Sequence, residues 1–285
     1  MDQVLSSAAR SIRMSDVLII MAGAGLSVDS GIPDFVDIHK ALPEISHLDL
    51  NVFEISNDNI FLKDPKFAWG VYGKRMDDYR KASPHEGYYI LLRWCLSKTE
   101  WWVYTSNIDQ HFVRAGFPKD RVVECHRSLY EFQCAKPCCD DVWDGRDVTL
   151  DYDEATLAVN GDIPTCRRCG DAARPCTVLA VDTRWLGAYT RQQEERMDKQ
   201  LADIPSPKSI VILEIGCGVQ MRKVRNKSEE LVSCFRKAGH RTTFIRINSN
   251  QEHIKMPAPL HHNDICLCQN ALDALTKMNE IFQSI

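Results

Sequence analysis

The chain has 285 residues, of which 44% are hydrophobic and 26% charged, the composition of an ordinary globular protein with a substantial core. Its formal net charge of −4 provides no general attraction for nucleic acid or for an anionic membrane surface. No stretch approaches the roughly 20 apolar residues of a membrane-spanning helix. We therefore expect neither direct nucleic-acid binding nor a membrane partner.

The chain alternates apolar runs of strand length with stretches of helical periodicity. The predicted strands are residues 17–21, 101–105, 122–124, 210–216 and 242–247. The predicted helices are residues 3–14, 64–81, 83–95, 191–201, 228–238 and 271–282. This alternation predicts an α/β fold, a doubly wound parallel sheet of the Rossmann-like kind with helices on both faces.

Two local patterns add detail to this outline. Residues 36–59 are polar and irregular, which predicts a loop. Ser83-Pro-His-Glu86 is a capping box with proline at the first helical position, so we expect the third helix to begin there. Ligands of parallel sheets bind beyond the carboxyl ends of the strands, where five segments converge. Each of the five segments stands at the end of a predicted strand, and they contain Gly23, Ser106, His126, Gly216 and Asn248. We therefore expect them to form one crevice.

The segment after the first strand has the composition of a phosphate-binding loop. Gly23-Ala-Gly25 lets backbone N–H groups approach a ligand closely. Ser27 and Asp29 offer helix-capping oxygens, so we expect a helix to begin here, and Gly31-Ile-Pro-Asp-Phe35 marks a turn. Strand, glycine turn and helix start together make a cradle for phosphate. The spacing is not the G-x-G-x-x-G of ordinary dehydrogenases, because position 28 is valine.

Residues 134–176 break the alternating pattern and predict a metal-stabilised module. The segment is rich in Cys, Asp, Pro and Gly and cannot build a core of its own. Cys134-x3-Cys138 and Cys166-x2-Cys169 offer four thiolates with the spacing of a tetrahedral zinc site. Cys139 competes with Cys138 for one ligand position, and we favour Cys138. Four sulfur ligands leave no open position for water, so the predicted zinc is structural.

The twelve cysteines fit metal ligation and buried free thiols better than a disulfide framework. A second interpretation takes Arg10, Arg13 and the apolar run from Val17 as a signal peptide. Asp16 beside that run, and the glycine loop where a cleavage site should lie, argue against it. We expect an intracellular protein, cytoplasmic or nuclear, that is not secreted.

The run Gly-Ala-Gly-Leu-Ser-x-x-Ser-Gly-Ile-Pro-Asp-Phe at residues 23–35 resembles the cofactor loop of the sirtuins, the NAD-dependent protein deacylases. The resemblance continues at Thr105-Ser-Asn-Ile-Asp109, at Glu124-Cys-His-Arg-Ser128 and at the two cysteine couples, in the sirtuin order. It covers roughly residues 8–275. It implies that NAD and zinc are the cofactors.

The resemblance also implies a domain organisation and a cofactor site. An NAD-binding Rossmann-like domain would comprise residues 1–127 and 177–285, with a helical insertion at about 38–82, and a small zinc-binding module residues 128–176. The implied cofactor-binding residues are Ala22, Gly23, Ala24, Gly25, Ser27, Gly31, Ile32, Pro33, Asp34, Phe35, Ser106, Asn107, Ile108, Asp109, Gly216, Cys217, Gly218, Asn248 and Ser249.

The catalytic residues that the resemblance implies are His126, Asn107 and Asp109. His126 stands where the sirtuin His-Gly-Ser motif places the general base, and an imidazole that titrates near neutrality suits proton removal from the cofactor ribose. The Asn107 amide can hydrogen-bond the nicotinamide carboxamide, and Asp109 complements the positive charge that develops on the ribose. The other histidines lack such a context and are expected at the surface; they include His39, His111, His261 and His262.

The function implied by the resemblance is that of a transferase. It would cleave NAD to nicotinamide and move the acyl group, acetyl or another, from the lysine of a protein or peptide to ADP-ribose. One alternative is mono-ADP-ribosyl transfer or NAD hydrolysis at the same site, and another is a catalytically weak sensor of NAD or ADP-ribose. Three departures from the family pattern bear on this choice: Val36 stands for arginine, Gln110 for glycine and Arg127 for glycine.

Overall fold

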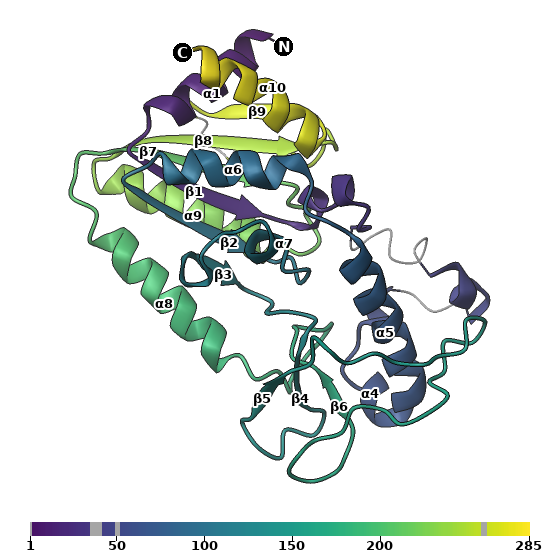
Figure 1. Cartoon of the computed structure of the whole chain (residues 1–285). Coiled ribbons are helices and arrows are strands. Elements are labelled where there is room, and N and C mark those ends of the chain that lie inside the picture. The colour runs from purple at the N-terminus through teal and green to yellow at the C-terminus, as the bar shows by residue number, and fades with distance from the viewer. Residues whose placement is uncertain (1, 35–41, 49–51, 258–260) are drawn as a thin grey trace. The chain divides into compact units, whose positions relative to one another are not determined.

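The computed structural model describes residues 2–34, 42–48, 52–257 and 261–285 (Figure 1). Its main sheet has six strands in the order β3-β2-β1-β7-β8-β9, and every neighbouring pair is parallel. The strands are β1 (Val17–Ala22), β2 (Glu100–Thr105), β3 (Val122–Glu124), β7 (Ser209–Ile215), β8 (Arg241–Asn248) and β9 (Ile265–Cys268). The strand order reverses between β1 and β7, which confirms the predicted doubly wound, Rossmann-like sheet.

Helices cover both faces of this sheet (Figure 1). Leu18 and Ile20 of β1 belong to one core, which α1, α6 and α10 complete. Ile19 and Met21 of the same strand belong to the opposite core with α8 and α9. The unbroken apolar run of β1 therefore reflects burial on both faces. The helices are α1 (Asp2–Met14), α6 (Glu86–Leu96), α7 (His111–Arg114), α8 (Ala188–Ala202), α9 (Lys223–Lys237) and α10 (Ala271–Ser284).

The main sheet belongs to a compact unit formed by the residues up to 31, residues 84–125 and residues 192–285. A second compact unit comprises residues 32–83 and 126–191. Among the described residues, no helix is both long and apolar enough to cross a membrane.

The second unit contains a small antiparallel sheet in the order β5-β4-β6, which the sequence analysis did not predict. Trp69 of α5 joins this sheet to the helices. Its indole ring packs edge-on against Phe132 at 4.8 Å, and its N–H donates to the Ala173 carbonyl at 2.8 Å. The elements of this unit are α3 (Val52–Ile55), α4 (Ile60–Lys63), α5 (Pro65–Lys81), β4 (Glu131–Cys134), β5 (Val142–Asp144) and β6 (Ala173–Pro175).

Two predictions about helix starts are wrong. The segment after Gly23 forms two 3-10 turns, η1 (Ala24–Leu26) and η2 (Val28–Ser30), instead of a longer helix. Ser27 does not cap a helix, because its hydroxyl bonds to other side chains. The capping box at Ser83 is also wrong: α6 begins at Glu86, and the His85 side chain caps it.

The stretch predicted as a loop at 36–59 contains helical turns in its described part. Residues Pro43–Leu48 form a 3-10 helix and Val52–Ile55 form α3, so the loop prediction is wrong there. Residues 36–41 and 49–51 lie outside the described residues. The polar composition concealed two short elements that are anchored by Ile45 and Ile55, both fully buried.

A first prediction concerns Gly70 in α5, which lies against the backbone of the buried Leu157. A Cβ there would lie 1.5 Å from the carbonyl oxygen of Leu157. Alanine normally stabilises a helix interior by about 1 kcal/mol relative to glycine. We expect the overlap to outweigh this gain, so that Gly70→Ala lowers the free energy of unfolding by about 1–3 kcal/mol, measured by urea denaturation.

The matched control is Gly161→Ala in the same unit, where a new Cβ has no atom within 4 Å. It should change the free energy of unfolding by no more than about 0.5 kcal/mol. Equal stability of the Gly70→Ala variant and the unmodified chain would contradict the expected overlap.

A second prediction concerns the pH dependence of the cap on α6. His85 Nδ1 accepts from the Gly87 N–H at 3.0 Å, and Nε2 lies 2.8 Å from the Leu26 carbonyl oxygen, so the folded protein holds the neutral ring. Burial lowers the pKa of His85. The contribution of the cap to stability is therefore fully present above the unfolded-state pKa of about 6.5. It is lost as the pH falls through the lowered pKa.

Loss of the cap in His85→Ala should cost about 0.5–2 kcal/mol of unfolding free energy at pH 7.5. The difference from the unmodified chain should narrow at pH 5.5, as urea denaturation at both pH values would show. His262→Ala, which alters an exposed ring, serves as the control. A difference that widens at pH 5.5 would contradict the neutral cap.

Candidate functional site

Three glycines bring the ends of β1 and β7 into direct backbone contact. The Gly23 N–H donates to the Ile215 carbonyl at 2.9 Å, and the Gly25 N–H donates to the Gly216 carbonyl at 3.0 Å. A Cβ at Gly23 would lie 2.6 Å from the Gly216 oxygen. Gly216 itself has φ +66°, and a Cβ there would lie 2.3 Å from the Leu26 nitrogen. The predicted glycine loop and the predicted 216–218 turn therefore share one location at the reversal of strand order.

A buried polar network lies directly beside this glycine contact. The Ser27 hydroxyl donates to Asp109 Oδ2 at 2.6 Å and accepts from Asn107 Nδ2 at 3.0 Å. The second carboxylate oxygen of Asp109 accepts from the His111 N–H at 2.8 Å. These contacts unite Ser27, Asn107 and Asp109, three residues that the sequence predicted for one pocket.

One amide oxygen of this network has no donor among the described residues. Asn107 Oδ1 is buried and accepts no hydrogen bond within the part of the chain that the structure describes. A buried amide oxygen without a donor is costly, so such an atom indicates a ligand or a water molecule at this position. The atom could accept a hydrogen bond from an amide N–H.

Tyr88 is a member of the network that the sequence analysis did not identify. Its hydroxyl lies 2.9 Å from Ser27 Oγ, and the side chain is fully buried in α6. Burial raises the pKa of Tyr88 well above its ordinary value, so the phenol is neutral. An aromatic residue on a helix face is typical of core packing, and no local pattern reveals the hydroxyl's partner 61 positions away.

The turn after β7 is fixed by side chains from β8 and α9. The Cys217 carbonyl accepts from Asn248 Nδ2 and from the Arg225 guanidinium, each at 3.2 Å. Asn248 Oδ1 accepts from the Asn250 N–H at 2.9 Å. A Cβ added to Gly218 would meet no atom within 4 Å, so this turn borders open space.

Behind this turn lies a buried charge network that the sequence analysis missed. Arg246 pairs with Glu214 at 2.6 Å and with Glu229 at 2.9 Å, and Arg225 lies 3.7 Å from Glu214. Burial raises the pKa of Glu214, and the positive charge of Arg246 opposes that rise. The sequence does contain one indication of this network, because Glu214 lies inside the apolar run 210–215. A charged side chain in a buried strand requires a partner of opposite charge.

The structure places the predicted residues in both units. Unit one holds Ala22–Gly31, Ser106–Asp109, Gly216–Gly218, Asn248 and Ser249, at or just after the ends of β1, β2, β7 and β8. Ile32, Pro33, Asp34 and His126 belong to the second unit. Phe35 and Val36 lie outside the described residues.

His126 is almost completely buried and has a firmly held backbone. Its carbonyl accepts from the Thr177 hydroxyl at 2.8 Å and from the Val178 N–H at 3.3 Å. The next residue, Arg127, has φ +56°, a conformation that favours the glycine expected there by resemblance. The Arg127 side chain pairs with Glu131 at 2.9 Å and lies over the Tyr189 ring, so its charge is compensated within its own unit.

The prediction that the remaining histidines lie at the surface is wrong for His85, His111 and His240, which are all buried. His111 is fully buried, with its ring edge-on to Tyr88 at 5.4 Å, at the start of the short helix α7 two residues after the buried Asp109. His261 and His262 are exposed, as predicted. His39 lies outside the described residues.

Four cysteines gather at a second candidate site, in the second unit. The sulfur atoms of Cys134, Cys138, Cys166 and Cys169 all lie within 4.8 Å of one another. The Cys134–Cys169 and Cys138–Cys166 sulfur distances are 3.8 Å and 3.5 Å. Tetrahedral zinc with bonds of about 2.3 Å requires sulfur separations of about 3.8 Å. The group contains Cys138 and not Cys139, and it fits the expected tetrahedral centre.

Comparisons with known proteins identify the family. The model of the Sir2 family matches residues 23–210. The NAD-dependent protein deacetylase 2 of Caldanaerobacter subterraneus subsp. tengcongensis is 31% identical over 179 residues, which are 63% of this chain and 66% of the relative. The NAD-dependent protein deacylase 2 of Pseudomonas aeruginosa is 26% identical over 61% of this chain and 64% of the relative. The chain thus spans just under two thirds of the length of these two relatives.

Solved structures agree with this result at the level of the fold. A structure concerned with the mechanism and regulation of Sir2 enzymes has a TM-score of 0.69 at 22% identity, over 100% of this chain and 99% of the other. A Sir2 homologue solved with NAD has a TM-score of 0.67 at 20% identity, over 97% and 93% of the two chains. Because the family model matches most of the sequence, the chain belongs to the Sir2 family.

Proposed function

We propose that the chain is an NAD-dependent protein-lysine deacylase that cleaves NAD to nicotinamide and transfers the acyl group to ADP-ribose. The observation that carries this proposal is the buried network of Ser27, Asn107 and Asp109 with its unpaired Asn107 oxygen. The names of the relatives, NAD-dependent protein deacetylase and deacylase, support it. The proposed substrates are accordingly proteins or peptides with an acylated lysine.

The residues of the first unit fit NAD. Asn107 Oδ1 would accept a hydrogen bond from the nicotinamide carboxamide, for which it has a free lone pair. Asp109, whose carboxylate is oriented by Ser27 and by the His111 N–H, would stabilise positive charge on the ribose. The turn at Gly218 leaves room beside it for the adenosine half. NAD would supply the ribose carbon from which nicotinamide departs.

His126 is proposed as the general base. Two hydrogen bonds fix its backbone carbonyl and so hold the residue in place, and an imidazole is a suitable general base near neutral pH. This role rests on the resemblance of residues 124–128 to the family motif. The Arg127 guanidinium forms an ion pair with Glu131, so we assign it no contact with the cofactor.

The four clustered cysteines are proposed to hold one structural zinc ion. Thiolate is a preferred ligand of zinc, and four of them complete its tetrahedral shell. The zinc would take no part in the reaction, because no coordination position remains for water or substrate.

A third prediction tests the reaction with NAD and peptides that carry lysine acylated with chains of several lengths. We expect nicotinamide release together with loss of the acyl mass from the peptide. His126→Ala should lower turnover by about 10²-fold or more while NAD still binds. His262→Ala, altering an exposed histidine, should leave turnover unchanged.

The mass of the peptide separates this function from its alternatives. A gain of ADP-ribose on the peptide would replace the proposal by ADP-ribosyl transfer, and nicotinamide release without any change of the peptide would indicate NAD hydrolysis. NAD binding without nicotinamide release would indicate a sensor.

A fourth prediction concerns the metal. Purified protein should contain one zinc ion per chain, and Cys166→Ser should lose it and melt at a lower temperature, because metal binding contributes directly to folding. Cys139→Ser is the matched control: its sulfur lies 3.8 Å from that of Cys138 but outside the group of four. Elemental analysis and thermal denaturation provide both measurements. Full zinc content in Cys166→Ser, or zinc loss confined to Cys139→Ser, would reject the assignment.

A further inference from the structure

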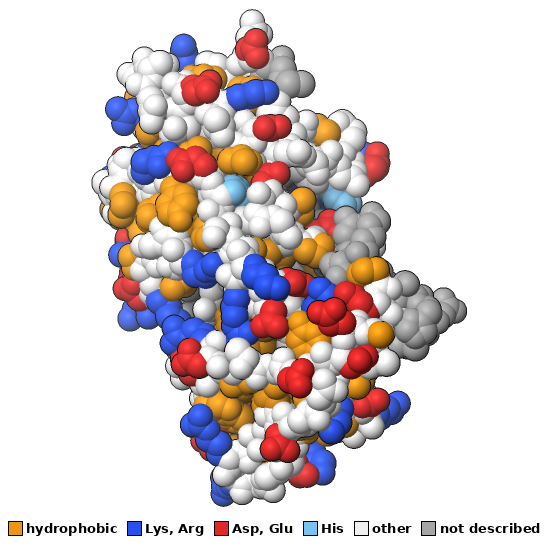
Figure 2. Space-filling model, turned by 45° about the vertical axis from the view of Figure 1, so that its right-hand side comes forward, with side chains coloured by type: hydrophobic (Ala, Val, Ile, Leu, Met, Phe, Trp, Pro, Cys, Tyr) orange, Lys and Arg blue, Asp and Glu red, His pale blue; other side chains and the backbone are white. Residues whose placement is uncertain are grey.

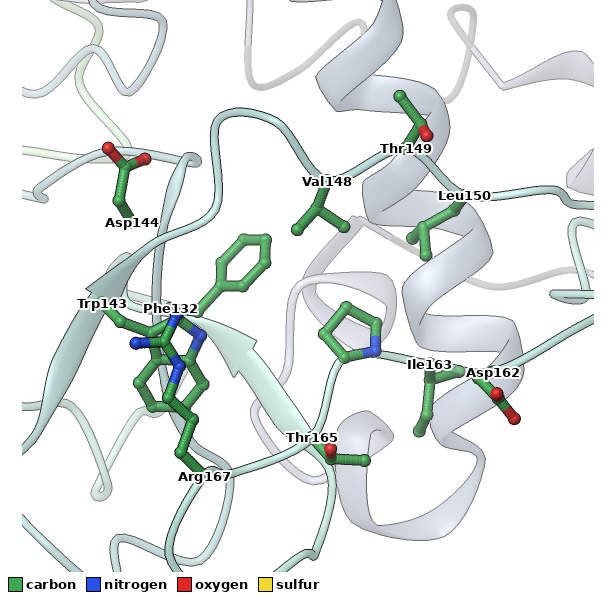
Figure 3. Close-up of a pocket in the computed structure, with 11 residues that line it drawn as sticks. Phe132, Trp143, Asp144, Val148, Thr149, Leu150, Asp162, Ile163, Thr165 and Arg167 are labelled. Carbon is green, nitrogen blue, oxygen red and sulfur yellow. The ribbon is translucent and has the colours of Figure 1, made fainter.

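A cavity of about 280 Å³ lies in the second unit (Figure 3). None of the residues assigned above to NAD, catalysis or zinc lines it, although Thr165 and Arg167 flank the proposed zinc ligand Cys166. Six apolar side chains contribute to its wall: Phe132, Trp143, Val148, Leu150, Ile163 and Pro164. Phe132 is fully buried, and the other five are partly exposed. Hydrophobic side chains also reach the surface in the lower part of Figure 2, the level at which Figure 1 places β4, β5 and β6.

The wall of this cavity is held in place by neighbouring elements. Phe132 belongs to β4 and packs on Trp69 of α5 at 4.8 Å. The Val148 carbonyl accepts from the Arg80 guanidinium, which ties the 148–150 segment to the same helix. A wall built on a sheet and a helix is preformed, so binding of a ligand would lose little conformational entropy in the wall.

Residues 140–162 supply six of the residues that line the cavity, and this segment is strongly acidic, although Arg167 and Arg168 follow it. Residues 140–162 contain eight acidic residues and one basic residue, a formal charge of −7, whereas the whole chain carries only −4. All eight of these carboxylates are exposed. The field of this segment therefore repels acidic partners and attracts basic ones.

Two carboxylates line the cavity and differ in their surroundings. Asp144 and Asp162 lie at opposite ends of it in Figure 3, with Phe132 and Val148 between them. Asp144 accepts from Arg146 Nε at 2.9 Å and 3.1 Å, so its charge is compensated. Asp162 has no ion pair or hydrogen bond within the described residues. Arg167 is the cation among the described residues that line the cavity, and it lies over the Trp143 ring at 5.7 Å.

We propose that this cavity is a docking site for a basic segment of a partner protein. One aliphatic side chain of the segment would cover the apolar wall at Phe132 and Ile163, and a neighbouring lysine or arginine would pair with Asp162. The apolar wall requires an apolar anchor, since burial of such a side chain supplies most of the affinity. The surrounding negative charge sets the sign of the flanking residues. This site does not depend on the proposed reaction.

The test uses a capped, fluorescein-labelled peptide with the sequence Gly-Lys-Lys-Leu-Lys-Lys-Gly and fluorescence anisotropy at physiological salt. We expect saturable binding to the zinc-loaded protein. Replacement of the leucine by serine should weaken binding by at least about tenfold, the value expected for the loss of one buried leucine. A peptide with glutamate in place of every lysine should not bind.

Variants of the chain separate docking from general charge attraction. Ile163→Ser should weaken binding of the leucine peptide by about tenfold, and Asp162→Lys by about three- to tenfold. Glu195→Lys makes the same charge change at an exposed position of α8 in the other unit and should alter affinity by less than about twofold. Zinc content and melting temperature would show that each variant is folded.

Methyl NMR of the unmodified protein provides a measurement that needs no variant. Saturation with the leucine peptide should shift the methyl resonances of Val148, Leu150 and Ile163. Unchanged methyl resonances, or equal weakening by Glu195→Lys and Asp162→Lys, would overturn the proposal. So would sedimentation of the free chain as a dimer that Asp162→Lys dissociates, because the occupant would then be a second copy of this chain.

Discussion

The first unit depends on the backbone contact between Gly23, Gly25 and Gly216. These glycines allow the loop after β1 to lie directly on the turn after β7. A Cβ at any of the three would overlap the opposite backbone. The contact also extends the strand pairing, since the Gly23 N–H donates to the Ile215 carbonyl one step beyond the last paired residues, Ala22 and Ile215. The loop therefore leaves the sheet at the point where the strand order reverses, which is where ligands of doubly wound sheets bind.

The path of the loop after this contact is set by side chains from distant segments. The His85 ring lies 2.8 Å from the Leu26 carbonyl oxygen, and the Ser30 hydroxyl accepts from the His85 N–H at 3.1 Å. Asp29 accepts from the Leu272 N–H at the start of α10. With Ser27 bound to Asp109, three separate parts of the unit hold two short 3-10 turns. A buried network of this kind fixes one geometry, which a loop of few apolar contacts could not do alone.

The main sheet could be predicted from the sequence because burial on both faces leaves an unbroken apolar run, as in Val17–Met21. The edge strand β9 gives no such run: Leu267 is buried between the exposed Cys266 and Cys268. The strands β4, β5 and β6 have only three or four residues, too few for a period of two to appear.

The candidate site also contains some residues that the sequence predicted and others that only the fold reveals. Ser27, Asn107 and Asp109 stand in short motifs next to strand ends, so the sequence predicted them. Tyr88 and His85 act through partners more than fifty positions away, at Ser27, Leu26 and Ser30. Only the fold brings such pairs together, and an aromatic residue or a helix cap has the same local pattern whether or not a distant polar partner exists.

The turn that the glycines contact on one side is held on the other by buried charge. Glu214 lies two residues before Gly216 and pairs with Arg246 of β8, while Arg225 of α9 donates to the Cys217 carbonyl and lies near the same carboxylate. Desolvation of such ions offsets most of their mutual attraction, so the network adds little to net stability. Its directional bonds nevertheless fix the carbonyl of Cys217, the residue directly after Gly216. We infer that the charges contribute geometry at this turn, and that the glycine contact requires that geometry because a small shift of Gly216 would separate the two backbones.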